Sequence, residues 1–520
     1  MQHRNDVPQS NRRWRKLAAS VTILVAAGLA AAGCTSSAAT VGTASSANVL
    51  TVGDPQPPTS LDPAIGTSGG DYVYLYMIYA RLLSFNQTTG AIEPGLATHW
   101  GFTGKDNLTF DLTLRKGARF QDGEPVTASA VAYSLRRYQQ LKVQTDLEAV
   151  SSITTTGTYS LALHLSSPDS ALPASLADRA GMVVCPKVAK KYGNNFASHP
   201  CGAGPYEVTS EVSGSSVAFK RFTGYYGGTP AYSTVTWTIF STATAMETAA
   251  RSGQLDVALQ ASAADVRQLR GSSDFSVKVG PSLLYTQVYF DDAEAPFKNA
   301  DVRLAFNYAI NRTALIDAVN GGLGSPAWQP VPAGNAFYSK TLGATYPYDP
   351  ARARSLMAKA GHADGVSFTC VDFPGLNFET AGPILQQEEA AVGIHIKIVE
   401  ESLSEALAQS AKGVYPCTFS AWTGRPDPAL ALSDLYDSNG IYNIGKANFG
   451  LDGPINKVLS SYGTSARIAA VQAAVAASIP EAPDAPLVYS PSVTLVSPSV
   501  SGFVNNFQGK EDLSLVRPAR

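Results

Sequence analysis

The block from Leu108 to Leu141 constrains the fold more than any other part of the chain. Apolar and polar residues alternate through LTFDLTLR, and a period of two predicts a strand with one buried face. Asp122-Gly123 then supplies a tight turn, and Thr127 precedes a helical pattern that it is suited to cap. A strand, a turn and a capped helix in this order predict an α/β layer.

Strand and helix patterns continue to alternate along the chain. We expect a strand at 48–54, a helix over 71–85 and one long helix over 301–319. Helical and extended patterns then follow one another from 351 to 400, which predicts a parallel or mixed sheet with helices on its faces. A hydrophobic content of 45% over 520 residues is enough for more than one core, and the chain has no basic excess that would point to nucleic acid.

The N-terminus carries the pattern of an export signal. Basic residues up to Lys16 precede a short apolar run, which predicts a signal peptide over 1–33 rather than a membrane-spanning helix. The Arg12-Arg13 pair leaves the choice between Sec and Tat export open. Residues 1–33 hold five basic groups and one acid, so their removal takes the net charge from −2 to −6.

Cys34 and its neighbours resemble the lipobox of bacterial lipoproteins, in which the cysteine is acylated. Ala31 departs from that pattern, which prefers leucine at this position. The segment 34–47 is rich in Ser, Ala and Thr, which predicts a flexible tether. The expected location is therefore outside the cell, anchored by lipid on Cys34 to the outer face of the cytoplasmic membrane, in a periplasm or cell-wall space.

The other four cysteines form an even set, which suggests disulfides in an oxidising compartment. Of three possible connectivities we favour Cys185–Cys201, which flank a short segment, and Cys370–Cys417, which lie in two strand-like runs. A zinc site is the alternative, but no CxxC pair and no adjacent histidines support it.

Several long motifs give the chain a family resemblance over nearly all of 48–520. They are EPGLATHW, LRKGARFQDGEPVTASAVAYSLRR, GAGPY, PFKNADVRLAFNYAINRTALIDAVNGGLGSPA, YDPARARSLMAKAG, GIHIKIVE and PDAPLVYS. In residue types and order the chain resembles the peptide/nickel-type (oligopeptide and dipeptide) solute-binding proteins of ATP-binding-cassette (ABC) importers, bacterial solute-binding protein family 5.

The resemblance implies an α/β fold of the two-lobed periplasmic-binding-protein type, with mixed sheets, a hinge and an extra inserted subdomain. Ligand would be enclosed between the lobes as they close. The implied division is a signal peptide at 1–33, a tether at 34–47, lobe I at 48–80, 201–288 and 491–520, the inserted subdomain at 81–200, and lobe II at 289–490.

An enzyme is the alternative from another functional class. GTSGG at 66–70 matches the G-x-S-x-G nucleophile elbow, but the residues before it form a proline-interrupted loop and not the strand that this motif needs. The six histidines lie in no triad-like or HExxH setting, and no GxxxxGK[ST] motif is present. We therefore expect no catalysis, no cofactor and no metal, and a separate ATPase.

The loop WTGRPDP, Trp422–Pro428, is the strongest ligand-binding candidate. Peptide binders that the chain resembles commonly carry an aspartate near this position, which pairs with the free α-amine of the peptide. Here Arg425 occupies that position and Asp427 comes two residues later. Either Asp427 meets an amine, or Arg425 holds a carboxylate or phosphate, or Arg425 makes a structural pair with Asp427 or Asp434.

Aromatic and small polar residues complete the candidate site. Trp422 is expected to form a pocket wall, since binding pockets favour aromatic side chains. By family position, the remaining candidates are Thr67, Ser68 and Gly69 in the first-lobe loop, Tyr285 and Gln287 before a crossover, and Tyr442 and Asn443 at the pocket border.

The predicted function is an extracytoplasmic substrate-binding lipoprotein, a monomer that captures a short peptide or peptide-like solute. It would deliver this solute to the permease subunits of an ABC importer. The low histidine content argues against nickel. Two alternatives stay open, a non-peptide anionic solute (opine-like or a sugar phosphate) held by Arg425, and a cell-wall serine hydrolase.

Overall fold

The computed structural model describes residues 48–66, 68–143 and 145–520. Cys34, Thr67, the predicted signal peptide and the predicted tether lie outside these residues. No helix in the described part of the chain is both long enough and apolar enough to cross a bilayer.

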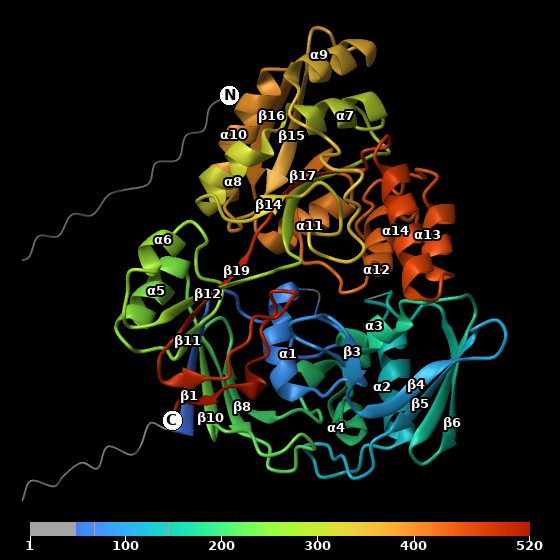
Figure 1. The fold of residues 1–520 in the computed structure, drawn as a ribbon, viewed down its shortest axis with the longest axis vertical. Helices are drawn as coiled ribbons and strands as arrows, with labels where there is room; N and C mark the ends of the chain where they lie inside the picture. Colours follow the sequence, from blue (N-terminus) through green and yellow to red (C-terminus); the bar gives the residue numbers. More distant parts are fainter. Residues whose placement is uncertain (1–47, 67, 144) are drawn as a thin grey trace, which may run out of the picture. The chain divides into compact units, whose positions relative to one another are not determined.

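A mixed sheet, here called sheet I, gathers strands from both ends of the described chain (Figure 1). Strand β1 runs parallel to β10 and β11, and the other pairs are antiparallel. The short helices α5 (Ala243–Arg251) and α6 (Val266–Leu269) pack beside it through their own apolar cluster. In spatial order the strands are β12 (Ser276–Gly280), β19 (Ser492–Val496), β11 (Val257–Ala258), β1 (Val49–Asp54), β10 (Thr234–Ile239), β9 (Ser216–Arg221) and β8 (Tyr206–Val212).

A second mixed sheet, sheet II, is built from the middle of the chain and has a separate apolar core. Its strands are, in order, β14 (Ser325–Pro326), β18 (Asp484–Tyr489), β13 (Tyr285–Phe290), β17 (Cys417–Trp422), β15 (Val366–Asp372) and β16 (Ile394–Glu400). The helices around it are α7 (Ala300–Ala309), α8 (Arg312–Asn320), α9 (Pro350–Lys359), α10 (Phe378–Ala390) and α11 (Leu403–Ala411). A group of three helices packs together beside them in Figure 1, namely α12 (Pro428–Tyr436), α13 (Asp452–Leu459) and α14 (Thr464–Ser478).

An antiparallel sheet, sheet III, lies in the segment predicted as an inserted subdomain. Its order is β4 (Ala97–Thr103), β5 (Thr109–Leu114), β7 (Ser160–Leu165) and β6 (Val150–Gly157). The buried residues of β5 alternate as the sequence predicted, and Thr127 accepts a hydrogen bond from the Ala130 N–H at 3.4 Å, which confirms it as the cap of the next helix. Helix α2 (Ala128–Leu141) packs against β6 and β7, and α4 (Pro186–Tyr192) packs against α2. Helix α1 (Tyr72–Ile78) contacts β8 of sheet I, and α3 (Leu172–Leu176) contacts the strand at Leu83–Phe85. Small strand pairs join β2 (Leu83–Phe85) to β3 (Ile92–Pro94) and β20 (Val500–Ser501) to β21 (Arg517–Pro518).

The chain passes between sheets I and II at two places that lie side by side. The first crossing follows Gly280 and the second follows Tyr489, and the Ser490 N–H donates to the Leu284 carbonyl at 3.2 Å. Strand β13 pairs with β17 and β18, so residues 285–288 belong to sheet II. Sheet pairing thus places the first crossing at 281–284, a few residues before the predicted lobe boundary at 288.

Two helix predictions need correction. The helix predicted over 71–85 ends at Ile78, because Tyr79 is extended, with φ −118° and ψ 129°, and residues 83–85 form β2. The single helix predicted over 301–319 is two helices, since Ile310 is extended and the Asn311 side chain caps α8 by accepting from the Ala314 N–H at 3.1 Å. In both cases the apolar spacing in the sequence continues past an extended residue that ends the helix.

Both predicted disulfides are present. Cys185 and Cys201 are 16 positions apart in the sequence, and Cys370–Cys417 joins register partners on the adjacent strands β15 and β17. With all four sulfurs bonded, these cysteines offer no thiolate to a zinc ion.

Removal of either disulfide should destabilise the protein, and more so for the longer loop, because the entropy of loop closure grows with the logarithm of loop length. By loop entropy, the Cys370→Ala/Cys417→Ala variant should lose about 4 kcal/mol of unfolding free energy, and Cys185→Ala/Cys201→Ala about 3 kcal/mol. Denaturant melts of the two variants and the wild type measure this. Equal melts for wild type and the 370/417 variant would contradict the expected order.

Candidate ligand-binding site

The WTGRPDP loop connects the end of β17 to the start of α12, and its shape depends on Gly424. This residue has a φ of +72°, and a Cβ there would collide with the Cβ of Leu283 at the first crossing. Only glycine meets both conditions without strain. The loop is therefore fixed against the place where the chain passes between the sheets.

Arg425 is held by two carboxylates. Its guanidinium lies 3.2 Å from Asp434 of α12 and 4.0 Å from Asp146, which comes from the segment containing sheet III. Burial disfavours the charged form, but Asp434 and Asp146 more than offset it and raise the pKa of Arg425 well above its usual value. The recess beside Arg425 has a volume of about 10 Å³, room for little more than one water. Of the roles left open by the sequence, the Arg425–Asp434 pair is thus the one present in the structure.

Asp427 also has partners within the protein. Its side chain caps α12 by accepting from the Ala429 N–H at 2.9 Å, and both its oxygens accept from one Arg467 nitrogen at 2.7 and 2.8 Å. Arg467 donates in addition to the Ser170 carbonyl at 3.0 Å. A ligand amine would compete with Arg467 for this carboxylate, so the geometry favours a structural role.

Three predicted site residues come together as an aromatic wall. Trp422 meets Tyr442 edge to face, with ring centroids 4.9 Å apart, and Tyr442 stacks on Tyr289 at 5.8 Å. Tyr285 is the register partner of Trp422 and lies fully buried beside it. The Arg425 guanidinium carbon lies 5.2 Å from the Trp422 ring, which places the charge at the end of this wall.

Several polar atoms on this buried face form no hydrogen bond with any residue that the structure describes. They are the Tyr285 hydroxyl, the Trp422 indole N–H and both amide atoms of Gln287. The Gln287 amide lies beside the Tyr289 hydroxyl but outside normal hydrogen-bond geometry. Buried polar atoms nearly always have partners in folded proteins, so this group is suited to receive a polar molecule.

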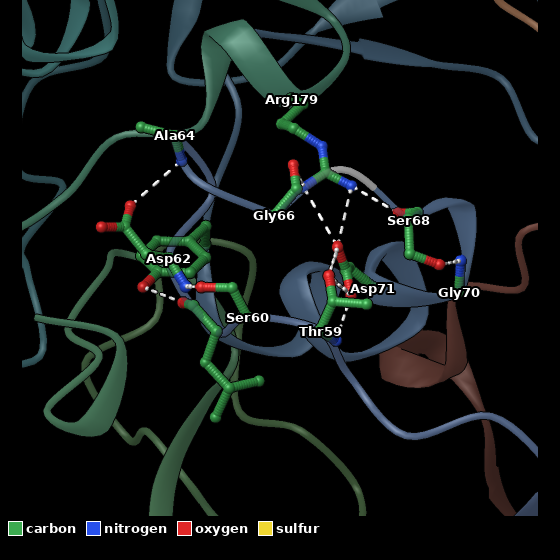
Figure 2. A network of polar contacts seen from close by, with 11 residues as sticks. Thr59, Ser60, Asp62, Ala64, Gly66, Ser68, Gly70, Asp71 and Arg179 are labelled. Atoms are coloured by element: carbon green, nitrogen blue, oxygen red, sulfur yellow. Dashed lines mark hydrogen bonds and ion pairs between the residues drawn. The ribbon is translucent and has the colours of Figure 1, made fainter. Parts of the chain in front are cut away.

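The first loop, residues 59–71 apart from Thr67, is organised by Arg179 and Asp71 (Figure 2). Arg179 donates to the carbonyls of Gly66 and Ser68 at 2.6 and 2.7 Å, and its guanidinium lies 3.4 Å from Asp71. The Asp71 carboxylate accepts from the Thr59 N–H at 2.7 Å. The buried ion pair thus fixes the backbone of this loop.

The first loop and the WTGRPDP loop touch each other. A Cβ placed on Gly69 would lie 2.5 Å from the Thr423 side chain, so close approach requires glycine there. Ser68 accepts a hydrogen bond from the Gly70 N–H at 3.1 Å and serves as a local cap. The structure therefore brings two predicted ligand loops from distant parts of the sequence together.

Asn443, unlike the aromatic residues, has its polar side-chain atoms hydrogen-bonded to the backbone of its own loop. Its amide donates to the carbonyls of Asp437 and Ala447 and accepts from the Ala447 N–H, which shapes its own loop. It remains a predicted site residue, with its polar atoms occupied by backbone.

The site includes charged residues that sequence reasoning did not select. Asp146, Asp178, Arg179 and Lys510 all act electrostatically on Tyr72 or on one another, and Arg425 lies in the same group. No local pattern identifies them, since they lie in three separate segments, with Asp178 and Arg179 adjacent. The available sequence signal was that Lys510 lies in the C-terminal segment 491–520, which was predicted to belong to lobe I.

The sequence model of the bacterial extracellular solute-binding proteins, family 5 (middle region), matches residues 91–443. The chain belongs to this family. It is therefore a solute-binding protein and not an enzyme, as predicted.

Two curated relatives of this family 5 protein illustrate the similarity. The glutathione-binding protein GsiB of Pectobacterium atrosepticum is 30% identical over 395 residues, covering 72% of this chain and 74% of the relative. GsiB of Salmonella typhi is 31% identical over 355 residues, covering 64% and 67%.

Solved structures show the fold. The DppA periplasmic binding protein of Helicobacter pylori, in complex with the peptide STSA, matches with a TM-score of 0.83 at 23% identity, covering 91% of this chain and 98% of its own. AgaA of A. tumefaciens R10, in complex with agropinic acid, matches with a TM-score of 0.82 at 24% identity, covering 91% and 99%. The predicted two-lobed periplasmic-binding-protein fold is confirmed.

Loss of the Arg425 cation should destabilise the ligand-free protein. Arg425→Ala leaves the buried Asp434 and the half-buried Asp146 without their shared cation, so the unfolding free energy should fall by about 3–5 kcal/mol. Denaturant melts of the ligand-free protein measure the change. Adding Asp434→Asn should recover part of the loss, and an unchanged melt for Arg425→Ala would show that the ion pairs contribute nothing.

Proposed function

We propose that this family 5 protein captures a short peptide or peptide-like solute between its two lobes and delivers it to the permease of an ABC importer. It works as a monomer, exported and lipid-anchored through Cys34, with the ATPase on a separate chain. The lipobox-like segment and the family membership support this assignment. The lobe division, with the first crossing at 281–284, and the candidate ligand residues other than Arg425 and Asp427 are part of the proposal.

The observation that carries the proposal is the group of buried polar atoms on β13 and β17 that have no partner among the described residues. Gln287 offers an amide donor and acceptor, Tyr285 a hydroxyl and Trp422 an indole N–H. A peptide presents both carbonyl acceptors and N–H donors along its backbone and therefore satisfies a wall of this mixed character. The aromatic faces of Trp422 and Tyr442 suit the less polar parts of such a ligand.

Named ligands of relatives agree with this class. Relatives named as glutathione-binding proteins and a structural neighbour in complex with the peptide STSA both bind peptides or a peptide-like compound.

A non-peptide anionic solute is the second candidate, because the neighbour AgaA holds agropinic acid. In this chain the predicted anion receptor Arg425 already faces Asp434 and Asp146, which weakens its use for an anion. The peptide reading therefore has the stronger support.

A panel of ligands separates the two candidates by thermal stabilisation. At about 100 times its dissociation constant, a specific ligand stabilises the folded state by about 2.7 kcal/mol. We expect glutathione or di- to pentapeptides to raise the melting temperature, and sugar phosphates and opines to leave it unchanged. The reverse result would replace the peptide proposal by the anionic one.

Gln287→Met provides a mutational test with effects of opposite sign. Removing an unpaired buried amide should stabilise the ligand-free protein by about 1–3 kcal/mol, while binding of the stabilising peptide should weaken at least about tenfold. The matched control is Gln329→Met, because the buried Gln329 amide donates to the Ser339 carbonyl at 2.9 Å and accepts from its N–H at 3.1 Å. The control should lose stability. If Gln287→Met also loses stability, the amide has a structural partner and the assignment fails.

A further inference from the structure

Lys510 is a buried cation without a hydrogen-bonding partner. Its side chain lies in the C-terminal segment, the residue is 4% exposed, and its ammonium nitrogen makes no hydrogen bond or ion pair with any described residue. The nitrogen lies 4.0 Å from the centroid of the Tyr72 ring. Burial lowers the pKa of Lys510 to about 7, with Asp178 acting in the opposite direction. A cation kept in such a place is suited to an anionic partner from outside the protein.

Asp178 is the matching anion. It is 4% exposed, and its Oδ1 makes no hydrogen bond within the described chain. The next residue, Arg179, lies over the same Tyr72 ring, with its guanidinium carbon 4.5 Å from the centroid. Asp178 is the strongest favourable charge acting on Lys510, but the two groups form no ion pair within 4.0 Å. They are near enough to interact and too far apart to neutralise each other directly.

Tyr72, which Lys510 contacts, and its neighbour Tyr76 supply aromatic surface beside these groups. Their ring centroids are 5.7 Å apart on α1, and the buried Tyr76 hydroxyl has no hydrogen-bonding partner among the described residues. Lys510, Asp178 and Tyr76 thus supply a cation, an anion and a hydroxyl, each buried, around one aromatic surface.

The two arginines near Lys510 and Asp178 already have partners within the protein. Arg179 is bound to the first loop and Asp71, while Arg425 lies between Asp434 and Asp146. Arg425 also acts electrostatically on Lys510, which places the lysine near the WTGRPDP loop rather than in a remote part of the molecule.

We propose that Lys510 and Asp178 form the head-group subsite of the cleft, with Lys510 receiving a ligand carboxylate and Asp178 a ligand ammonium group. The subsite selects zwitterionic ligands, and it takes over the charge recognition that the sequence assigned to Arg425 and Asp427. This inference rests on the proposed function, since it assumes a ligand between the lobes.

The test pairs changes in the ligand with changes in the protein. The probes are glutathione and the dipeptide γ-Glu-Ala, in which the γ-glutamyl ammonium and carboxylate share one carbon. Each is measured by calorimetry in the free form, with this amine acetylated, and with this carboxylate amidated. For the wild type we expect each modification to weaken binding by about 10- to 100-fold, as for lost hydrogen bonds to charged groups. Lys510→Met should bind the free and amidated probes alike, and Asp178→Asn should bind the free and acetylated probes alike.

Folding of the variants is checked separately. Lys510→Met removes an unpaired buried charge, so its ligand-free melting temperature should equal or exceed that of the wild type. Lys457→Met, at an exposed lysine of α13, is the matched control and should keep the full discrimination of the wild type.

The outcomes separate the subsite from the function. If free probes bind the wild type and Lys510→Met still discriminates against amidation, the subsite assignment is overturned and the peptide-binding function stands. If no free probe binds the wild type while a sugar phosphate or an opine does, the peptide function itself fails, and the zwitterion subsite fails with it.

Discussion

The buried charges of the WTGRPDP loop are the interaction on which the arrangement of the site depends. A charge removed from water must be neutralised, and here Arg425 is neutralised by Asp434 and Asp146, and Asp427 by Arg467. These partners come from different parts of the chain. The pairs therefore tie the loop to α12 and α14 and, through Asp146, to the segment that holds sheet III.

Backbone contacts add to the same connection. Arg467 donates to the Ser170 carbonyl, and the Ser170 N–H and hydroxyl donate to the Leu459 and Val458 carbonyls at 2.8 and 3.1 Å. The first loop reaches the WTGRPDP loop through the contact of Gly69 with Thr423. Since the crossings between sheets I and II also lie side by side, the site is bounded by contacts that a hinge motion would make and break.

With the loop charges committed to structure, our proposal assigns recognition to two sets of polar groups that have no hydrogen-bonding partner among the described residues. These are the mixed polar wall of Tyr285, Gln287 and Trp422, and the Lys510–Asp178 pair around Tyr72. One offers donors and acceptors suited to a peptide backbone, and the other offers opposite charges suited to an ammonium and a carboxylate that lie close together on the ligand. Both features favour the same ligand class, although the first lies on sheet II and the second is formed by residues outside the sheets.

Much of the fold was predictable because it follows from local patterns of apolar and polar residues in the sequence. The alternation in β5, the Thr127 cap and both disulfides follow from residue type and spacing. The break between α7 and α8 was missed because apolar spacing continues through Ile310, and only the backbone turns.

The candidate site was predictable in part. The sequence located the two loops that meet and the aromatic wall, because the family resemblance fixes their order. It left the role of Arg425 open, since the Asp146 partner is 279 positions away and no pattern joins them. Lys510 was missed for the same reason, because its burial depends on α1 packing against the C-terminal segment.

The central claim is that the cleft holds a peptide-like zwitterion. Mass spectrometry of the small molecule released when the purified protein is denatured tests it most directly. The account predicts a compound of peptide size that carries both an amine and a carboxylate. A phosphorylated or purely anionic compound without an amine, released in stoichiometric amount, would contradict it.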